Sequence, residues 1–248
     1  MLPFVHLLVP FYGVCASLGL LAAFGVFLFR SRSSGLGLLK NVQLAAVVAI
    51  GILVGSRILF VITMLPSIFA DFSFDRLLNT VINGGFVFYG GLLGTIAAVF
   101  IYGRARKIDI DNLFKLVVPC FPLFHAFGRI GCFMSGCCYG IPFSFGFPMA
   151  FDPDTIRFPV QLAESACCLL IFAALLAVER KRPDVQLLYI YLISYGIIRF
   201  GLEFLRGDAV RGVWGPFSTS QWISLAVIAV CIIKIVKNKR SLKHEERI

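Results

Sequence analysis

Seven apolar stretches of about 20 residues each, separated by short polar segments, constrain the fold of this chain more than any other feature. A helix of that length spans the hydrocarbon core of a bilayer. One crossing per stretch places membrane spans near residues 11–29, 42–65, 84–102, 113–131, 159–178, 187–205 and 219–236. Of the 248 residues, 59% are hydrophobic and 15% are charged, which is too apolar for a soluble protein of this size. We predict an all-α integral membrane protein with seven transmembrane helices in a single domain, residues 1–248.

Basic residues follow every second span. Clusters come after the first, third, fifth and seventh spans, and they are Arg30/Arg32/Lys40, Arg104/Arg106/Lys107, Arg180/Lys181/Arg182 and Lys237–Arg247. Because cytoplasmic loops are enriched in Lys and Arg, we predict that the N-terminus lies outside and the C-terminus inside. This placement also explains the formal net charge of +10 without nucleic acid as a partner.

The segment His125–Gly140 brings a cation, four glycines and three thiols together. Pro119 and Pro122 precede this segment, and a loop rich in Phe, Pro and Gly follows it. Glycine-rich backbone at the end of a helix can bind an anion through its N–H groups. We expect a membrane helix to end here, and residues 132–158 to form a loop or arm at the outer face.

Three arginines lie inside the predicted spans: Arg57, Arg129 and Arg199. An arginine at the centre of a transmembrane helix costs roughly 2.5–3.5 kcal/mol on insertion scales, so such residues are rare and usually functional. At a rise of about 1.5 Å per residue, all three fall in the outer half of the membrane. Only Glu164 and Glu203 are near enough to pair with them, so we expect an anion from outside the protein as a further partner.

The sixth span carries Tyr195, Arg199, Glu203 and Arg206 at helical spacing, so these side chains share one face. An ion pair between Arg199 and Glu203 would hold the helix bundle together. In a functional interpretation, Arg199 binds a phosphate and Glu203 orients the guanidinium. This interpretation is compatible with a structural ion pair between the two residues. His125 lies one turn from Arg129, where a hydrogen-bonded packing role competes with a catalytic one.

Cys132, Cys137 and Cys138 lie in or beside the glycine-rich segment, and four interpretations of them stay open. On an oxidising face, Cys132 could form a disulfide with Cys137 or Cys138. A thiol nucleophile would need a base within reach. Zinc ligation with His125 would use a spacing that matches no standard zinc site. Inert packing is the fourth interpretation, and we expect neither a metal nor a cofactor.

Four motifs occur in a fixed order along the chain. They are GGFVFYGGLLG at 84–94, GRIG at 128–131, PVQLAE at 159–164 and YGIIRFGLEFLR at 195–206. In this order they resemble the bacterial prolipoprotein diacylglyceryl transferases, and the resemblance extends from Tyr12 to Gln221. Members of that family transfer the diacylglyceryl group of phosphatidylglycerol to the cysteine thiol of a prolipoprotein. The resemblance implies a multi-pass enzyme of the bacterial inner membrane whose active site faces outward.

The resemblance also implies roles for particular residues. Arg129 and Arg199 match the family's phosphate-binding arginines, and fixed guanidiniums can stabilise the charge on a departing phosphate monoester. The residues expected to be catalytic are Arg129, Arg199, Glu203, Tyr89 and His125. Those expected to bind substrate are Tyr12, Arg57, Gly140, Tyr195, Arg206, Gln161 and Gln221.

Three positions depart from the family's pattern. Tyr89 stands where the family has His, and Cys132 and Cys137 replace its Asn and Glu. A neutral tyrosine is a poor general base near pH 7. The candidates for the base are Glu203, which is best placed, His125 and Glu164. The acceptor is either a prolipoprotein cysteine or another nucleophile, such as a glycan or lipid hydroxyl. A non-enzymatic binder or transporter of anionic phospholipids is the alternative function.

Overall fold

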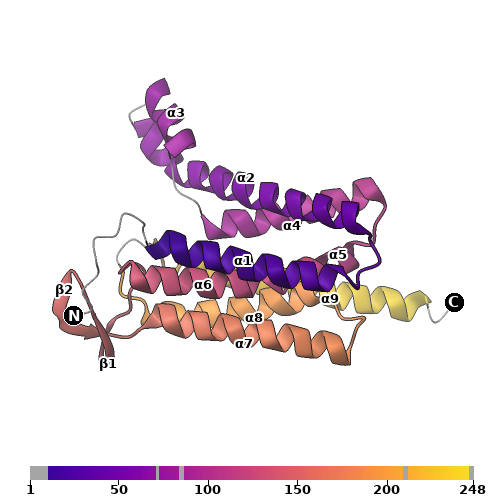
Figure 1. Cartoon of the computed structure of the whole chain (residues 1–248). Coiled ribbons are helices and arrows are strands. Elements are labelled where there is room, and N and C mark those ends of the chain that lie inside the picture. The colour runs from indigo at the N-terminus through magenta and orange to yellow at the C-terminus, as the bar shows by residue number, and fades with distance from the viewer. Residues whose placement is uncertain (1–10, 71–72, 84–86, 209–211, 246–248) are drawn as a thin grey trace. The chain divides into compact units, whose positions relative to one another are not determined.

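A computed structural model describes residues 11–70, 73–83, 87–208 and 212–245 (Figure 1). The helices are α1 Phe11–Ser31, α2 Leu38–Ala70, α3 Phe74–Asn83, α4 Phe88–Arg106, α5 Ile110–Val117, α6 Cys120–Met134, α7 Val160–Lys181, α8 Leu187–Leu202 and α9 Thr219–Glu245, with a 3-10 helix at Glu203–Leu205. The strands are β1 Pro142–Met149, β2 Asp152–Arg157, β3 Val213–Trp214 and β4 Phe217–Ser218. The all-α expectation therefore omitted two small antiparallel sheets, β1–β2 and β3–β4.

Within the described residues, six helical segments are long and apolar enough to cross a membrane. They are Phe11–Ser31, Leu38–Leu65, Ile110–Met134, Val160–Lys181, Leu187–Leu205 and Thr219–Lys237, and each matches a span expected from the sequence. The remaining expected span, 84–102, begins in residues that the structure does not describe. Helix α4, which is 19 residues long, overlaps most of this span but is not among the six segments that are long and apolar enough to cross a membrane. The chain is a multi-pass membrane protein, and the count of seven spans stays a prediction.

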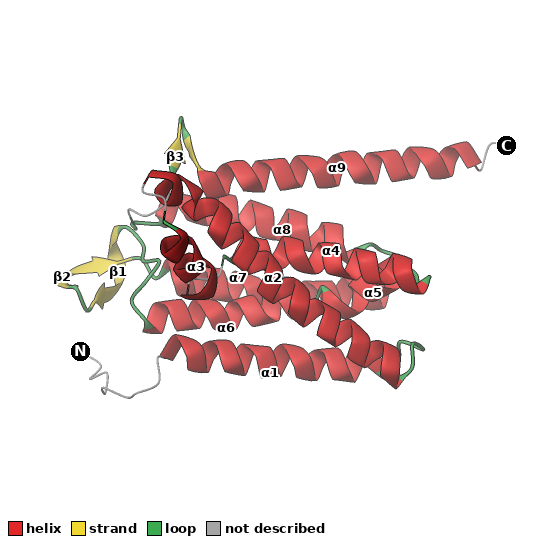
Figure 2. Ribbon diagram, turned by 90° about the horizontal axis from the view of Figure 1, so that it is seen from above, coloured by secondary structure: helices red, strands yellow, loops and turns green. Residues whose placement is uncertain are grey.

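The described contacts divide the chain into two compact units, one formed by residues of 1–29 and 115–248 and the other by Arg30–Phe114. The expectation of a single domain stays a prediction. In the first unit α1, α6, α7, α8 and α9 run side by side (Figures 1 and 2). Helix α7 packs against both α6 and α8, and α8 packs against α9. A Cβ at Gly19 would lie 2.7 Å from Cβ of Phe127, so α1 packs closely on α6.

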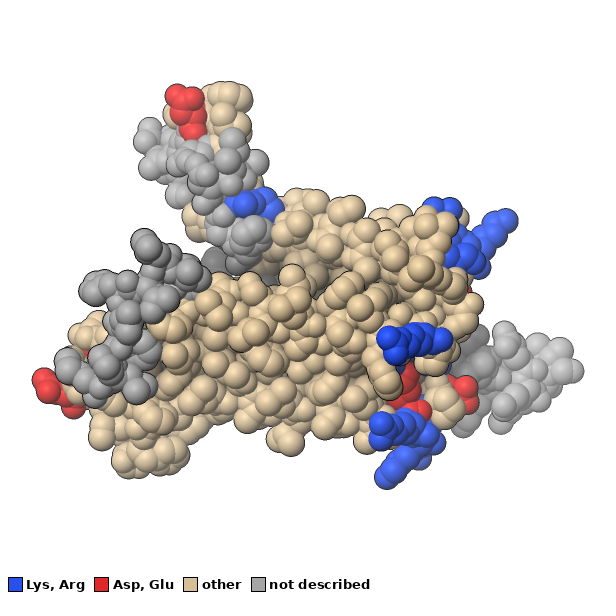
Figure 3. All heavy atoms as spheres, in the orientation of Figure 1, with Lys and Arg blue, Asp and Glu red and all other residues tan. Residues whose placement is uncertain are grey.

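The alternating directions of these helices bring the expected site residues to one end of the first unit. The last turns of α6 and α8 lie there with the first turns of α7 and α9 and the β1–β2 hairpin (Figure 2). Basic residues occupy the other end, where Arg180 and Lys181 close α7 (Figure 3). Between the two ends, large apolar side chains such as Leu170, Ile197 and Val230 are exposed, as expected of helices that face lipid.

In the second unit, α2 and α4 pack together through glycines. Gly51 and Gly55 on α2 face Gly90 and Gly94 on α4. A Cβ at Gly55 would collide with the carbonyl oxygen of Gly90, and a Cβ at Gly94 would collide with that of Gly51. Small residues four positions apart on both helices allow this close approach of backbones in a membrane.

The β1–β2 hairpin lies within the segment 132–158, which was expected to form a loop or arm. Arg157 at its end forms an ion pair with Asp152, with 2.7 Å between Nη2 and Oδ2. The Arg157 guanidinium lies 5.0 Å from the centre of the Tyr139 ring. Hydrogen bonds from Arg157 and then Thr155 hold the pKa of Asp152 below its usual value. The hairpin is thus tied to the chain that leaves α6.

Candidate active site

Helix α6 supplies the first part of the site. Pro122 lies in its first turn, where a missing N–H costs little, and a glycine-containing turn ends the helix. Arg129 Nε donates a hydrogen bond to Nε2 of His125 at 3.2 Å, which confirms that the two share a face. The buried His125 ring packs edge-on against Tyr195, with 5.1 Å between ring centres.

Glu164, one turn into α7, is the centre of the site. Its Oε2 lies 3.0 Å from Arg129 Nε and 3.8 Å from Arg199 Nη1. Its Oε1 accepts a hydrogen bond from the Tyr195 hydroxyl at 3.0 Å. The carboxylate is 2% exposed, and a buried charge of this kind requires paired cations and hydrogen bonds. Glu164 therefore links α7 to α6 and α8.

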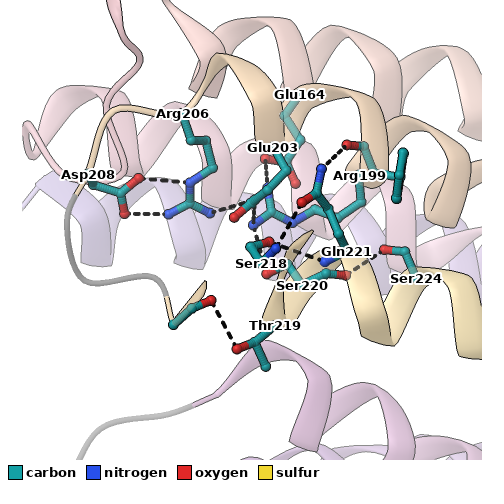
Figure 4. Close-up of polar contacts among 12 residues, drawn as sticks. Glu164, Arg199, Glu203, Arg206, Asp208, Ser218, Thr219, Ser220, Gln221 and Ser224 are labelled. Carbon is teal, nitrogen blue, oxygen red and sulfur yellow. Dashed lines mark hydrogen bonds and ion pairs between the residues drawn. The ribbon is translucent and has the colours of Figure 1, made fainter. Parts of the chain in front are cut away.

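Arg199 lies in the last turn of α8 and pairs with Glu203, with 2.6 Å between Nη2 and Oε2. This confirms the expected ion pair one turn apart. The same Glu203 oxygen lies 4.0 Å from Arg206 Nη1, so the carboxylate stands between two guanidiniums (Figure 4). Arg199 Nη2 also donates to Ser220 Oγ of α9 at 3.2 Å.

Arg206 follows the 3-10 helix and donates two hydrogen bonds to Asp208, at 2.9 and 2.6 Å (Figure 4). Burial opposes its charge, but the Asp208 carboxylate outweighs burial and raises the pKa of Arg206. The backbone of Arg206 pairs with that of Gly140 in an isolated bridge. A Cβ at Gly140 would collide with the carbonyl oxygen of Phe158 and come within 3.0 Å of that of Leu205, so a glycine is required there.

The three arginines of this site each have a carboxylate partner. The pairs are Arg129–Glu164, Arg199–Glu203 and Arg206–Asp208. Glu164 and Glu203, the two carboxylates expected to lie near enough to the buried arginines, pair with Arg129 and Arg199, and Asp208 is a third carboxylate that pairs with Arg206. Sequence reasoning missed Asp208 and Ser220 because both lie beyond the end of α8, where helical spacing no longer predicts which side chains meet.

Charge balance still leaves hydrogen-bond donors unused. Both contacts of Arg129 use Nε, and its Nη1 and Nη2 donate to no residue that the structure describes. The Arg129 side chain is 14% exposed. Arg199 Nη1 is buried and likewise donates no hydrogen bond within the described part of the chain. Guanidinium groups with unused planar donors are suited to bind a phosphate.

Tyr12 and Gln161 lie at the same end of the unit. A Cβ at Gly131 would lie 3.2 Å from the Tyr12 ring, so Tyr12 covers the last turn of α6. Gln161 is buried and donates from Nε2 to the carbonyl oxygen of Cys137 at 2.7 Å. Its Oε1 accepts no hydrogen bond from the described residues. The structure thus brings both expected substrate-binding residues to the end of α6.

Gln221 has a structural role at the start of α9 in addition to the substrate-binding role expected from the sequence. Its Oε1 accepts a hydrogen bond from the backbone N–H of Ser218 at 2.9 Å, and its own N–H donates to Ser218 Oγ at 3.3 Å (Figure 4). This reciprocal pair is a capping box at the start of α9. Gln221 Nε2 donates to the carbonyl oxygen of Phe200 at 3.3 Å. These bonds use both polar ends of the side chain, and the substrate-binding role expected for Gln221 stays a prediction.

The three cysteines after Arg129 come together. The Sγ atoms of Cys132, Cys137 and Cys138 lie within 4.8 Å of one another, and all three are free thiols. Hydrogen bonds with Cys132 and Cys137 lower the pKa of the Cys138 thiol; burial opposes this, and two nearby guanidiniums reinforce it. His125, considered as a fourth metal ligand, is hydrogen-bonded to Arg129 instead. We call the three cysteines the thiol cluster.

Two expected site residues lie in the second unit. Arg57 is on α2 and Tyr89 is on α4, and both are half-buried. Tyr89 directly precedes Gly90, which packs against Gly55 of α2. The roles expected for Arg57 and Tyr89 stay predictions.

These features define a class of protein. It is a multi-pass membrane protein in which arginines and carboxylates form buried pairs at one end of a helix bundle. Some guanidinium N–H groups there make no hydrogen bond to the described residues. A family model described as prolipoprotein diacylglyceryl transferase matches residues 2–237. The chain belongs to the prolipoprotein diacylglyceryl transferase family, as its motifs indicated, and is therefore a member of a family of transferases.

Individual relatives cover most of the chain. A phosphatidylglycerol–prolipoprotein diacylglyceryl transferase of Clostridium tetani is 35% identical over 228 residues, which is 89% of this chain and 90% of that protein. A protein of Clostridium perfringens with the same name and the number 2 is 32% identical, over 94% of this chain and 93% of its own. A Geobacter sulfurreducens protein of the same name is 33% identical, over 88% of this chain and 86% of its own. The expectation of an enzyme of this kind is confirmed.

Proposed function

We propose that this chain transfers the diacylglyceryl group of phosphatidylglycerol to the cysteine thiol of a prolipoprotein. The observation that carries the proposal is the set of unused donors on Arg129 and Arg199, beside one buried carboxylate, Glu164. A phosphate group placed there would receive charge-assisted hydrogen bonds that the described chain leaves unmade. The names of the relatives supply the donor and the acceptor.

In this reaction the acceptor sulfur attacks the glyceryl carbon that is bound to the phosphate oxygen. A C–S bond forms as the C–O bond breaks, and glycerol phosphate leaves with an additional negative charge. Arg129 and Arg199 stabilise this charge because Glu164 and Glu203 already fix their orientation, so little reorganisation is needed. Glu164 and Glu203 act as positioning residues in this account.

The contacts of Glu203 favour this role over that of a general base. Its Oε2 lies 2.6 Å from Arg199 and 4.0 Å from Arg206, so this oxygen faces two guanidiniums that it can hold in orientation. Glu203 was expected from the sequence to be the best placed of the candidate bases, and we propose a positioning role for it instead. A thiol acceptor fits a site whose carboxylates orient arginines, because part of a thiol is already ionised near pH 7, whereas a glycan or lipid hydroxyl depends more on a general base.

We further propose that α4 is the seventh span and that the site faces the outer side of the bacterial inner membrane, with the N-terminus outside and the C-terminus inside. The basic residues Arg180 and Lys181 support this orientation, because they lie at the end of α7 opposite to Glu164.

The test uses the purified full-length protein in vesicles that contain phosphatidylglycerol, together with a prolipoprotein signal peptide that carries either Cys or Ser at the acceptor position. The mass of the peptide and the released glycerol phosphate are both measured. We expect equimolar glycerol phosphate and diacylglyceryl peptide with Cys, and none with Ser. Release of glycerol phosphate with a modified lipid or glycan would assign a different acceptor. No release with any acceptor, from protein that is folded, would contradict the proposal.

A further inference from the structure

The thiol cluster takes no part in the reaction described above, although it follows Arg129 directly on α6. We infer that Cys132, Cys137 and Cys138 bind a zinc ion, and that its fourth coordination position receives the thiol of the acceptor. The second half of this inference rests on the proposed function; the first half does not.

The spacing of the three sulfur atoms suits zinc. Zinc binds thiolates at about 2.3 Å, so tetrahedral ligands lie about 3.8 Å apart. The three Sγ atoms already lie within 4.8 Å of one another, so side-chain adjustments of about 1 Å or less would complete the site. Three protein ligands with one open position are typical of catalytic zinc sites, whereas structural zinc sites have four.

Backbone contacts hold the thiol cluster in place. The N–H of Cys137 donates to the carbonyl oxygen of Cys132 at 3.1 Å, and Gln161 donates to the carbonyl oxygen of Cys137 at 2.7 Å. Gly136 has a φ of 70° and Cys138 a φ of 56°. Positive φ is uncommon for a residue with a side chain, and such backbone persists where its surroundings enforce it. The turn that carries the three sulfur atoms is therefore held in one backbone conformation by hydrogen bonds.

The charges nearby suit three thiolates. Three thiolates and Zn²⁺ together carry one negative charge, and a bound metal ion ionises its thiol ligands. Arg129 lies one turn before Cys132 on α6, and the backbone of Arg206 pairs with Gly140, two residues after Cys138, so two arginines adjoin the thiol cluster. Sequence spacing alone predicted no metal, because two of these ligands are adjacent and match no standard zinc motif.

The position of the thiol cluster relative to Arg129 gives the metal a chemical use. Cys132 is three residues after Arg129, so the two lie on the same side of α6. An acceptor thiol in the fourth position would lose its proton to solvent, and its sulfur would attack the glyceryl carbon of a donor held by Arg129. The C–S bond forms, the C–O bond breaks, and the electron pair leaves with glycerol phosphate. No oxidant or reductant is required, since zinc stays divalent.

Metal content tests the first half of the inference. The full-length protein is loaded with Zn²⁺ in the presence of a reductant, freed of excess metal, and analysed by mass spectrometry for zinc. We expect about one zinc per chain, and at least about tenfold less in Cys132→Ser, Cys137→Ser and Cys138→Ser. The matched control is Cys120→Ser, at the start of the same helix, which should keep its zinc. Absence of zinc from the wild type, or equal zinc in Cys137→Ser, would overturn the site.

Cobalt tests the fourth position. Co²⁺ in a thiolate site gives a sulfur-to-metal charge-transfer band, and binding of a fourth thiolate should intensify it. Adding the signal peptide with Cys should change the band, and adding the peptide with Ser should not. An unchanged band with the Cys peptide, at concentrations where the peptide binds, would remove the acceptor from the metal.

Activity separates this inference from the proposed function. Protein that binds zinc through the thiol cluster but transfers no diacylglyceryl group would refute the proposed function and leave the metal site in place. Protein stripped of zinc by a chelator that still transfers at the full rate would support the proposed function and overturn the catalytic use of the metal. A disulfide within the cluster, with no zinc bound after reduction, would overturn the metal site.

Discussion

At the scale of single residues, Glu164 holds together groups from two neighbouring helices. Arg129 on α6 and Arg199 and Tyr195 on α8 all contact its carboxylate. Arginines inside a membrane require such compensation, and removing one member of a buried ion pair costs more than the pair itself contributes. The same contacts keep unused donors of Arg129 and Arg199 near one carboxylate, so we expect stability and substrate binding to depend on the same residue.

Replacing Glu164 with Gln tests this dual role. Glu164→Gln keeps the size of the side chain but removes the charge that orients both arginines, so we expect the rate of glycerol phosphate release to fall about 100-fold. The free energy of unfolding should fall by about 3 kcal/mol, because two buried cations lose a partner. Both quantities are measured on the purified variant. The matched control is Glu179→Gln, near the other end of α7, which should change neither; a Glu164→Gln variant with the wild-type rate would refute the positioning role.

At the scale of helices, α2 and α4 pack backbone against backbone at their glycines. Gly55 and Gly94 leave no room for a Cβ, whereas Gly25 of α1 has no heavy atom within 4 Å of the position that a Cβ would take. Lipid offers no hydrophobic driving force for helix association. Van der Waals contacts between closely packed backbones therefore contribute to the association of α2 with α4.

The contrast between these glycines gives a direct prediction. Gly55→Ala should lower the free energy of unfolding by about 2 kcal/mol through overpacking, which corresponds to roughly 6 °C in Tm for a chain of this size. Gly25→Ala, the control, should leave Tm unchanged or raise it slightly, because alanine favours helix. Thermal unfolding of both variants in the same detergent provides the measurement. Equal Tm values for the two would show that α2 and α4 are not packed through Gly55.

At the scale of the whole molecule, hydropathy predicted the membrane helices well. Six of the seven expected spans match helices of sufficient length, because the bilayer demands long apolar runs that are visible in any sequence. Helical spacing likewise predicted the contacts of His125 with Arg129 and of Arg199 with Glu203. Apolar run length and helical spacing both depend on residues that are close together in the chain, so a single sequence is enough to show them.

Contacts made outside the regular helices were harder to predict. Asp208 pairs with Arg206 beyond the end of α8, and Gln221 donates to the carbonyl oxygen of Phe200, a contact that depends on how α9 packs against α8. The thiol cluster was visible as composition, but the distances among its sulfur atoms depend on a turn with positive φ at Cys138. The hairpin β1–β2 was missed although Phe143, Phe145 and Phe147 alternate with smaller residues in β1, because prolines at 142 and 148 argue against a strand.

The orientation of the molecule is tested by labelling. In a Cys137→Ser background, which removes an exposed native thiol, Asp154→Cys should react with an impermeant maleimide added to intact cells from the outer side. Asp154 lies in the hairpin, at the same end as the candidate site. Arg182→Cys, just beyond the last turn of α7, should react only after the membrane is opened. The reverse result would invert the topology and move the site to the inner face.

The central claim is that the guanidiniums of Arg129 and Arg199 hold the donor phosphate, and the rate of glycerol phosphate release by Arg199→Lys tests it most directly. Lysine keeps the charge but lacks the planar set of donors that binds a phosphate while pairing with Glu203. We predict a rate lower by about 100-fold in folded protein, with Arg180→Lys at the wild-type rate. A wild-type rate in Arg199→Lys would contradict the claim.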